Sequence, residues 1–360
     1  MTSTMQLSQD YVEARGRFLD AAREADVPVV HHDHPLAGPG GEALATDVAI
    51  VGAPDAPNRL LVISGTHGVE GFAGSMCQTE WLARGARVPD DLAVVLVHAI
   101  NPYGFAWIRR VNEDNVDLNR NCIDFGGALP QNPGYDLLAS ALVPTTWDET
   151  TQEETTGELL GYAAEHGFDA LQDAVSRGQY QHEKGVYFGG RRPVWSRATL
   201  EAIARSRLTD ATRTGIIDLH TGLGPFGVGE LIASHPGPAG KERLASWYGD
   251  GAYTLPSEGS SVSSDVTGDV LDGLDDWLDS PEVTGVAIEW GTVDIVEVAN
   301  SLRADAWLHS YGDPRGPEAG PIKAGLKAAF APADPQWAGM VWDRFTEVTG
   351  AAAAGLESSG

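Results

Sequence analysis

Short apolar runs alternate with segments of helical spacing along this chain, and that alternation most restricts how it can fold. The apolar runs at 46–51, 60–64, 92–98, 215–219 and 283–288 are bounded by turn residues and have the length of buried strands. Helical spacing is found at 8–24, 70–84, 156–177, 196–208, 239–248, 267–279, 318–330 and 335–349. This order is typical of a three-layer α/β/α fold with helices on both faces of a mixed, mostly parallel sheet.

The chain of 360 residues has no internal repeat and no long low-complexity linker. We expect a single domain over 1–350 with two inserted loops, at about 101–155 and at 178–195. The last ten residues, AAAAGLESSG, are small or polar and predict a flexible tail at 351–360.

The composition is acidic, with 51 Asp and Glu against 24 Lys and Arg and a formal net charge of −27. Nucleic acids and anionic membranes need a basic surface, so we exclude both as partners. A small anionic substrate is also repelled at long range, and a site for it requires buried Arg side chains that reverse the field locally. The sequence does not indicate an oligomeric state.

The chain start is polar, and the longest apolar stretch, 92–100, is far shorter than the roughly 20 residues of a membrane helix. The two cysteines, Cys77 and Cys122, suit a reducing compartment as buried thiols. We expect a cytoplasmic protein.

The first chemically informative segment is Ser-Gly-Thr-His67-Gly-Val-Glu70, which directly follows an apolar run. Parallel sheets bind ligands beyond the carboxyl ends of their strands. Imidazole nitrogen and carboxylate oxygen are both zinc ligands, so His67 and Glu70 are candidates for one ion. Taken alone, His-x-x-Glu also occurs by chance, with the glutamate capping a surface turn.

A third ligand follows another apolar run in Asp218-Leu-His220. A close pair of ligands and a remote third leave the fourth zinc position open, as catalytic sites require. Asp218 lies on the same strand face as His220, where it orients a ligand or binds nearby amides or an Arg.

Glu289 lies at the end of a third apolar run, and the segment 107–121 concentrates Arg and Asn. A buried carboxylate needs a partner or a task, so Glu289 is either a structural ion-pair residue or a general base. Arg side chains bind carboxylates bidentately. For Arg109 we favour pairing with acidic residues of its own segment.

Together, the four segments resemble the zinc carboxypeptidase-like metallohydrolases, which include the carboxypeptidases and the succinylglutamate desuccinylase and aspartoacylase branch. The resemblance covers about 60–292, and the motifs occur in the family's order. It implies that His67, Glu70 and His220 hold one Zn²⁺ per chain and that Glu289 is the general base.

The same resemblance implies roles for the Arg-rich segment. Arg110 corresponds to the residue that polarises the scissile carbonyl, with Arg109 as its rival, and Asn119 and Arg120 correspond to the clamp for the substrate carboxylate. No tyrosine is assigned to the mobile position that carboxypeptidases have.

The implied activity is zinc-dependent hydrolysis of an amide bond next to a substrate carboxylate, as in a metallocarboxypeptidase acting on a small peptide. An N-acyl amino acid deacylase of the same superfamily is the alternative, and the sequence does not separate the two. A noncatalytic zinc-dependent binder of amino acids or peptides is a third interpretation.

One motif points elsewhere. Gly222, Gly224 and Gly227 match the spacing of a dinucleotide-binding loop, but Pro225 interrupts it and the segment from Gly229 has the pattern of a strand instead of a helix. We interpret the motif as a glycine-rich loop near the pocket.

Overall fold

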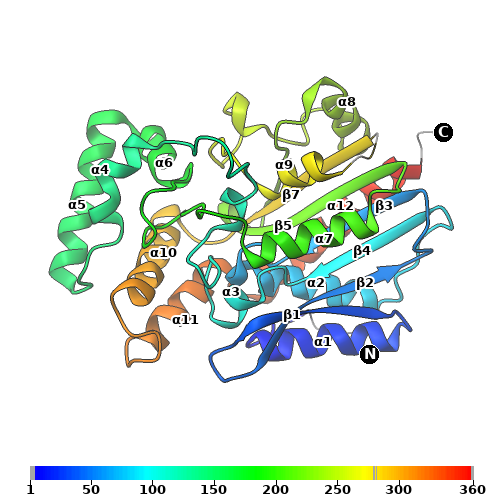
Figure 1. The fold of residues 1–360 in the computed structure, drawn as a ribbon, viewed down its shortest axis with the longest axis horizontal. Helices are drawn as coiled ribbons and strands as arrows, with labels where there is room; N and C mark the ends of the chain where they lie inside the picture. Colours follow the sequence, from blue (N-terminus) through cyan, green and yellow to red (C-terminus); the bar gives the residue numbers. More distant parts are fainter. Residues whose placement is uncertain (1–4, 279, 281, 358–360) are drawn as a thin grey trace.

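A seven-stranded mixed sheet forms the centre of the structure, a computed structural model that describes residues 5–278, 280 and 282–357 (Figure 1). The spatial order is β1–β2–β4–β3–β5–β7–β6. The four central strands β4, β3, β5 and β7 are parallel, and antiparallel strands extend the sheet at both edges. The bounds are β1 (Val29–Ala37), β2 (Ala43–Val51), β3 (Asn58–Ser64), β4 (Leu92–His98), β5 (Arg213–Phe226), β6 (Gly229–Ile232) and β7 (Glu282–Gly291).

Helices cover both faces of this sheet, which confirms the predicted α/β/α class. The bounds are α1 (Tyr11–Glu24), α2 (Gly71–Ala83), α3 (Pro102–Ala106), α4 (Pro133–Leu142), α5 (Glu149–His166), α6 (Phe168–Ser176), α7 (Trp195–Arg207), α8 (Gly237–Tyr248), α9 (Val270–Trp277), α10 (Ile295–Ser310), α11 (Ala319–Phe330) and α12 (Pro335–Glu357). Helices α1, α2, α8 and α12 pack on one face, and α7 and α9 pack on the other. Helices α4–α6, α10 and α11 share a separate core, at the left of Figure 1.

Strand β3 shows why the middle of a central strand is apolar on both of its faces. Leu60 and Val62 pack in the core beneath α2 and α12, whereas Leu61 and Ile63 pack beneath α7. Successive side chains of a strand point to opposite faces, so a strand covered on both sides needs apolar residues at each step.

The two inserted segments contain more helix than the sequence indicates. The predicted loop at 101–155 includes α3, α4 and the start of α5, and the single helix predicted at 156–177 is two helices divided at Gly167, whose φ is +97°. Side-chain caps begin three of these helices, because Asn101 accepts from the backbone N–H of Gly104, Asn132 from that of Tyr135 and Asp148 from that of Thr151.

The expectation of a flexible tail is wrong for residues 351–357, which form the end of α12. Alanine has the highest helix propensity, and Ala352 and Leu356 are fully buried. Gly355 packs against the indole of Trp247 so closely that a Cβ would lie 2.4 Å from its ring. Residues 358–360 of the predicted tail lie outside the described part, and the single-domain interpretation of 1–350 stays a prediction.

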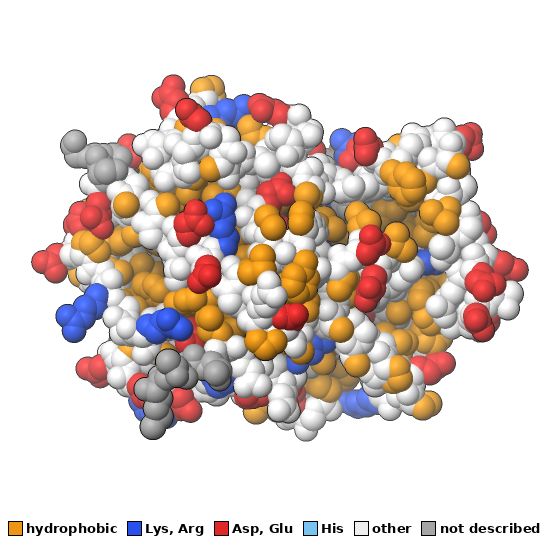
Figure 2. All heavy atoms as spheres, turned by 180° about the vertical axis from the view of Figure 1, so that it is seen from behind, with side chains coloured by type: hydrophobic (Ala, Val, Ile, Leu, Met, Phe, Trp, Pro, Cys, Tyr) orange, Lys and Arg blue, Asp and Glu red, His pale blue; other side chains and the backbone are white. Residues whose placement is uncertain are grey.

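The surface reflects the composition. Figure 2 shows acidic side chains scattered over the back face, with hydrophobic side chains between them and few basic ones. Among the described helices, none combines the length and the hydropathy needed to cross a membrane.

Candidate metal centre

The carboxyl ends of three parallel strands bring the predicted site residues to one edge of the sheet. His67 is the third residue after the end of β3, His220 lies within β5, and Glu289 lies on β7 directly beside His220 in register. Gly68 makes the turn after β3 possible, because a Cβ there would lie 2.0 Å from the backbone of Gly104.

The two histidines and Glu70 converge on one point. Oε1 of Glu70 lies 2.9 Å from Nδ1 of His67, and Oε2 lies 2.9 Å from Nδ1 of His220. The two Nδ1 atoms are 3.2 Å apart. All three side chains are buried, and they have the arrangement of a metal site, with each residue offering one ligand atom.

The spacing of these atoms fits a tetrahedral ion such as zinc. Two nitrogens that each lie about 2.0–2.1 Å from such an ion are about 3.3 Å apart. The distance between the Nδ1 atoms of His67 and His220 is 3.2 Å.

Each histidine also has a carboxylate on its far ring nitrogen. Nε2 of His67 lies 3.1 Å from Asp117, and Nε2 of His220 lies 2.7 Å from Asp218. Such partners fix the tautomer and the ring orientation of metal-binding histidines. Asp218 is therefore placed to orient the ring of His220. The hydroxyl of Thr66 donates to Asp218 at 2.8 Å and fixes it in turn.

The cluster has an excess of negative charge. Burial lowers the pKa of His220, but Asp218 and Glu70 outweigh it and raise this pKa well above its ordinary value. Burial opposes the ionisation of Glu70, yet the neighbouring histidines hold the pKa of Glu70 below its usual range. Three buried carboxylates around two imidazoles thus favour an added cation, as a divalent metal supplies.

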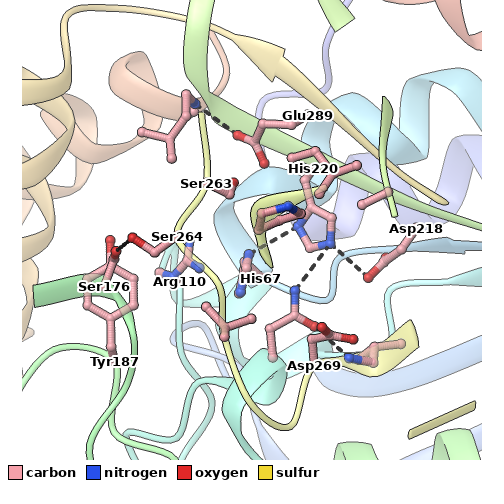
Figure 3. Close-up of a pocket in the computed structure, with 18 of the residues that line it drawn as sticks. His67, Arg110, Ser176, Tyr187, Asp218, His220, Ser263, Ser264, Asp269 and Glu289 are labelled. Carbon is pink, nitrogen blue, oxygen red and sulfur yellow. Dashed lines mark hydrogen bonds and ion pairs between the residues drawn. The ribbon is translucent and has the colours of Figure 1, made fainter. Parts of the chain in front are cut away.

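Glu289 faces the same pocket from β7 (Figure 3). The backbone N–H of Leu223 donates to its Oε1 at 2.8 Å. Burial, followed by the charge of Glu70, raises the pKa of Glu289 to about 7. A carboxylate poised near neutrality is suited to accept and return a proton.

Arg110, Asn119 and Arg120 line this pocket, a cavity of about 120 Å³. Arg110 donates to Glu70 at 3.0 Å and to Asp117 at 2.9 Å. The amide oxygen of Asn119 accepts from the backbone of Val270 at 3.1 Å, and its nitrogen lies 3.5 Å from Nε2 of His220. Contacts within the protein therefore already fix the side-chain amide of Asn119.

Arg120 is buried at the pocket wall. Its guanidinium donates to the backbone oxygens of Asn119 and Ser176, and its Nε has no hydrogen-bond partner within the described residues. Arg120 lines the pocket as a residue, but this Nε atom is itself buried beside Gly178.

Arg109 does not line the pocket, so it is placed neither to bind substrate nor to rival Arg110 there. Its buried guanidinium pairs with Asp305 at 3.1 Å and with Asn115 at 2.8 Å. We expected Arg109 to pair with acidic residues of its own segment, but its acidic partner is Asp305, which lies on α10. Consecutive side chains point apart here, and Arg110 alone of the two reaches the pocket.

Sequence reasoning did not identify Tyr187, which lies on one side of the pocket in Figure 3. Its ring centroid is 5.1 Å from the guanidinium carbon of Arg110 and 5.6 Å from that of Arg120. Its φ is +54°, a conformation that is costly for a tyrosine and that clusters at functional sites. The one available signal was its place in a Gly-rich segment inside the predicted insertion 178–195.

The glycine-rich motif has the role of a loop beside the pocket. Gly222 and Gly224 adopt positive φ, and β6 follows at Gly229 as the sequence predicted. The backbone N–H of Leu223 in this loop donates to Glu289, so the loop positions that carboxylate. A strand follows the loop, where a dinucleotide-binding loop would be followed by a helix.

Solved structures with a similar fold include three from the group that the motifs resemble. Carboxypeptidase A from Helicoverpa armigera is 12% identical over 91% of this chain and 75% of its own, with a TM-score of 0.47. Succinylglutamate desuccinylase from Chromobacterium violaceum is 16% identical over 89% and 74%, with a TM-score of 0.38. An aspartoacylase family protein from Mesorhizobium loti is 16% identical over 81% and 68%, with a TM-score of 0.35. Likeness at this level says nothing about substrate.

A search of the curated proteins gives no match. A family described as "Protein of unknown function (DUF2817)" matches residues 7–344. Because this match covers most of the chain, the protein belongs to the DUF2817 family.

Proposed function

We propose that this protein is a zinc-dependent hydrolase that cleaves an amide bond next to a substrate carboxylate. The observation that carries the proposal is the convergence of His67, Glu70 and His220 within 4.8 Å, with Glu289 on the adjacent strand. A purely structural cluster has no need of a further, half-buried carboxylate beside it, whose pKa is raised to about 7.

Zinc held by His67, Glu70 and His220 supplies a Lewis acid that polarises a carbonyl and lowers the pKa of water. Glu289 takes a proton from the attacking water and returns it to the departing amine, so that water and amide give a carboxylic acid and an amine. A group in this role contributes about 10² to 10⁴ in rate. Asp117 and Asp218 keep both imidazoles oriented.

Arg120 and Arg110 supply the positive charge that a substrate carboxylate needs in a chain of net charge −27. Arg110 is tied to Glu70 and Asp117, so it acts beside the metal ligands, where a carbonyl oxygen develops charge. Arg120 lines the pocket and pairs with backbone oxygens, not with a carboxylate, within the described residues, so it is the better candidate for the substrate carboxylate. Tyr187, whose ring centroid lies 5.1 Å from the guanidinium carbon of Arg110 and 5.6 Å from that of Arg120, positions both groups.

The test is hydrolysis by zinc-loaded protein of a panel of C-terminal peptides and N-acyl amino acids, with products identified by mass spectrometry. We expect turnover of at least one class, and loss of turnover after removal of metal by a strong chelator. Undiminished turnover in metal-free protein contradicts the proposal.

A noncatalytic binder gives a different result in the same experiment. Zinc-loaded protein then binds amino acids or peptides without cleaving any member of the panel. Glu289→Gln leaves such binding unchanged, whereas in a hydrolase it removes most of the turnover and retains the zinc.

A further inference from the structure

A second cavity lies beside the metal pocket, between helices α4–α6 and α10. Its volume is about 320 Å³, against about 120 Å³ for the metal pocket. We call it the apolar chamber. Aliphatic side chains make up much of its wall, among them Leu142, Leu159, Leu171, Val175, Val298 and Leu302.

The apolar chamber and the metal pocket share part of their walls. Ser176, Tyr187, Leu223, Val298 and Leu302 line both cavities. In Figure 3, Ser176 and Tyr187 stand on one side of the pocket whose centre is formed by His67 and His220. The two cavities therefore adjoin along this wall, and the inference below requires that a substrate held at the metal centre extend past Tyr187 into the chamber.

Hydrophobic side chains also stand exposed at the chamber's rim. Phe168 is 69% exposed, Leu160 49%, Ile295 48% and Val296 51%, and all four line the cavity. Grouped exposed apolar residues mark a binding site. On a chain of net charge −27 such an uncharged group is a distinct feature, and it suits an apolar chain.

Arg303, the one charged residue among the described residues of the chamber wall, is not available to a ligand. Arg303 donates from its guanidinium to the carbonyl oxygens of Ala141 and Leu142 and to the side chains of Thr155, Thr156 and Asn300. These contacts use all five of its N–H donors. A second carboxylate, such as the distal end of a dicarboxylic acyl group, therefore finds no free guanidinium donor on Arg303.

The chamber is larger than one amino-acid side chain requires. A volume of about 320 Å³ holds about ten groups of the size of a water molecule, at about 30 Å³ each. A leucine side chain has four carbon atoms and a phenylalanine side chain has seven. We infer that the chamber binds the unbranched aliphatic acyl chain of an N-acyl amino acid, with about eight to ten carbons.

This inference rests on the proposed function, since it names the substrate class of the same site. The experiment measures kcat/KM for N-acetyl, N-butanoyl, N-octanoyl and N-decanoyl derivatives of one amino acid with zinc-loaded protein. Burial of each methylene group raises binding about fourfold. We expect the octanoyl derivative to exceed the acetyl derivative on the order of a hundredfold or more.

Two variants at Leu171 change the chamber in opposite directions, and Leu137 provides a matched control. Leu171→Trp fills the chamber and lowers the octanoyl-to-acetyl ratio of kcat/KM at least tenfold, while Leu171→Ala enlarges it and moves the optimum to a longer chain. Leu137, 73% exposed on α4, lies outside the chamber lining, so Leu137→Trp leaves the ratio unchanged. The ratio cancels differences in the amount of folded protein.

Two results with an active enzyme overturn the inference. One is an equal kcat/KM for acetyl and octanoyl substrates, and the other is faster cleavage of peptides ending in Phe or Leu than of any acyl derivative. In both cases the proposed hydrolase function stands.

If the zinc-loaded protein cleaves no amide, the proposed function fails. Calorimetric titration with N-octanoylglycine then tests the chamber by itself, because it measures binding without catalysis. Binding that Leu171→Trp weakens at least tenfold supports the chamber assignment. No binding by the unaltered protein overturns it.

Discussion

His220 and Glu289 occupy paired positions on the adjacent parallel strands β5 and β7. The pairing places a candidate metal ligand and a candidate base side by side, and both lie on regular strands instead of on loops. Strand pairing is among the most rigid ways to hold two groups in fixed relation, so the fold itself sets the geometry between them.

Replacement of the proposed base separates catalysis from metal binding. We expect Glu289→Gln to lower kcat by about 10² to 10⁴ with the zinc content unchanged, because the amide keeps the shape but accepts no proton. Steady-state kinetics and metal analysis on the same preparation check this. Full activity in the variant removes Glu289 from the mechanism.

The same residue predicts the pH dependence of activity. Burial and then the charge of Glu70 raise the pKa of Glu289 to about 7 in the protein without metal. A bound divalent cation favours the ionised form and lowers this pKa. Because the base acts when ionised, kcat/KM rises with pH along an acid limb with its midpoint at or below 7. A profile that lacks this limb in the unaltered protein contradicts the assignment.

The carboxylate behind His220 tunes the affinity for metal. Asp218 lies 2.7 Å from Nε2 of His220, and Asp218→Asn is expected to weaken zinc binding about 10- to 100-fold. Competition with a chromogenic chelator measures this. Asp276→Asn, an exposed change on α9, is the control. Equal affinities in the two variants mean that Asp218 does not orient the ligand.

A buried ion pair away from the pocket predicts acid sensitivity. Burial opposes the ionisation of Asp305, but Lys323 and Arg109 outweigh it and lower its pKa to about 2. The folded pKa lies below the ordinary value of about 4, so this carboxylate stabilises the fold above about pH 4 and the contribution is lost as the pH falls towards 2.

We therefore expect Asp305→Asn to lower the free energy of unfolding by about 3–5 kcal/mol at neutral pH, because it leaves two buried cations without a carboxylate. The difference from the unaltered protein narrows between pH 4 and pH 2. Urea unfolding at several pH values measures it, with the exposed Asp210→Asn as control. A difference that is independent of pH would show that charge is not the cause.

The sheet and the convergence of the ligands could be predicted because both follow from local patterns. Apolar runs of strand length and turn residues reveal β3, β5 and β7, and parallel strands bring their carboxyl ends together. His67, Glu70 and His220 were predictable as a group for that reason. The amphipathic pattern also revealed most helices, although α10 was missed because its first turn is β-branched and exposed.

The direction of side chains in irregular segments could not be predicted. Arg109 and Arg110 are neighbours, and Ile108 before them has a φ of +49°, which no periodic rule anticipates. Arg109 turns to Asp305, 196 positions later in the chain. Tyr187 reaches the pocket from a long insertion for the same reason. The cytoplasmic location also stays a prediction.

The most direct test of the account is a crystal structure of zinc-loaded protein with data collected on both sides of the zinc absorption edge. The account predicts one anomalous peak per chain, within bonding distance of Nδ1 of His67, Nδ1 of His220 and a carboxylate oxygen of Glu70. Fully loaded crystals without a peak at this position, or with the zinc bound elsewhere, would contradict it.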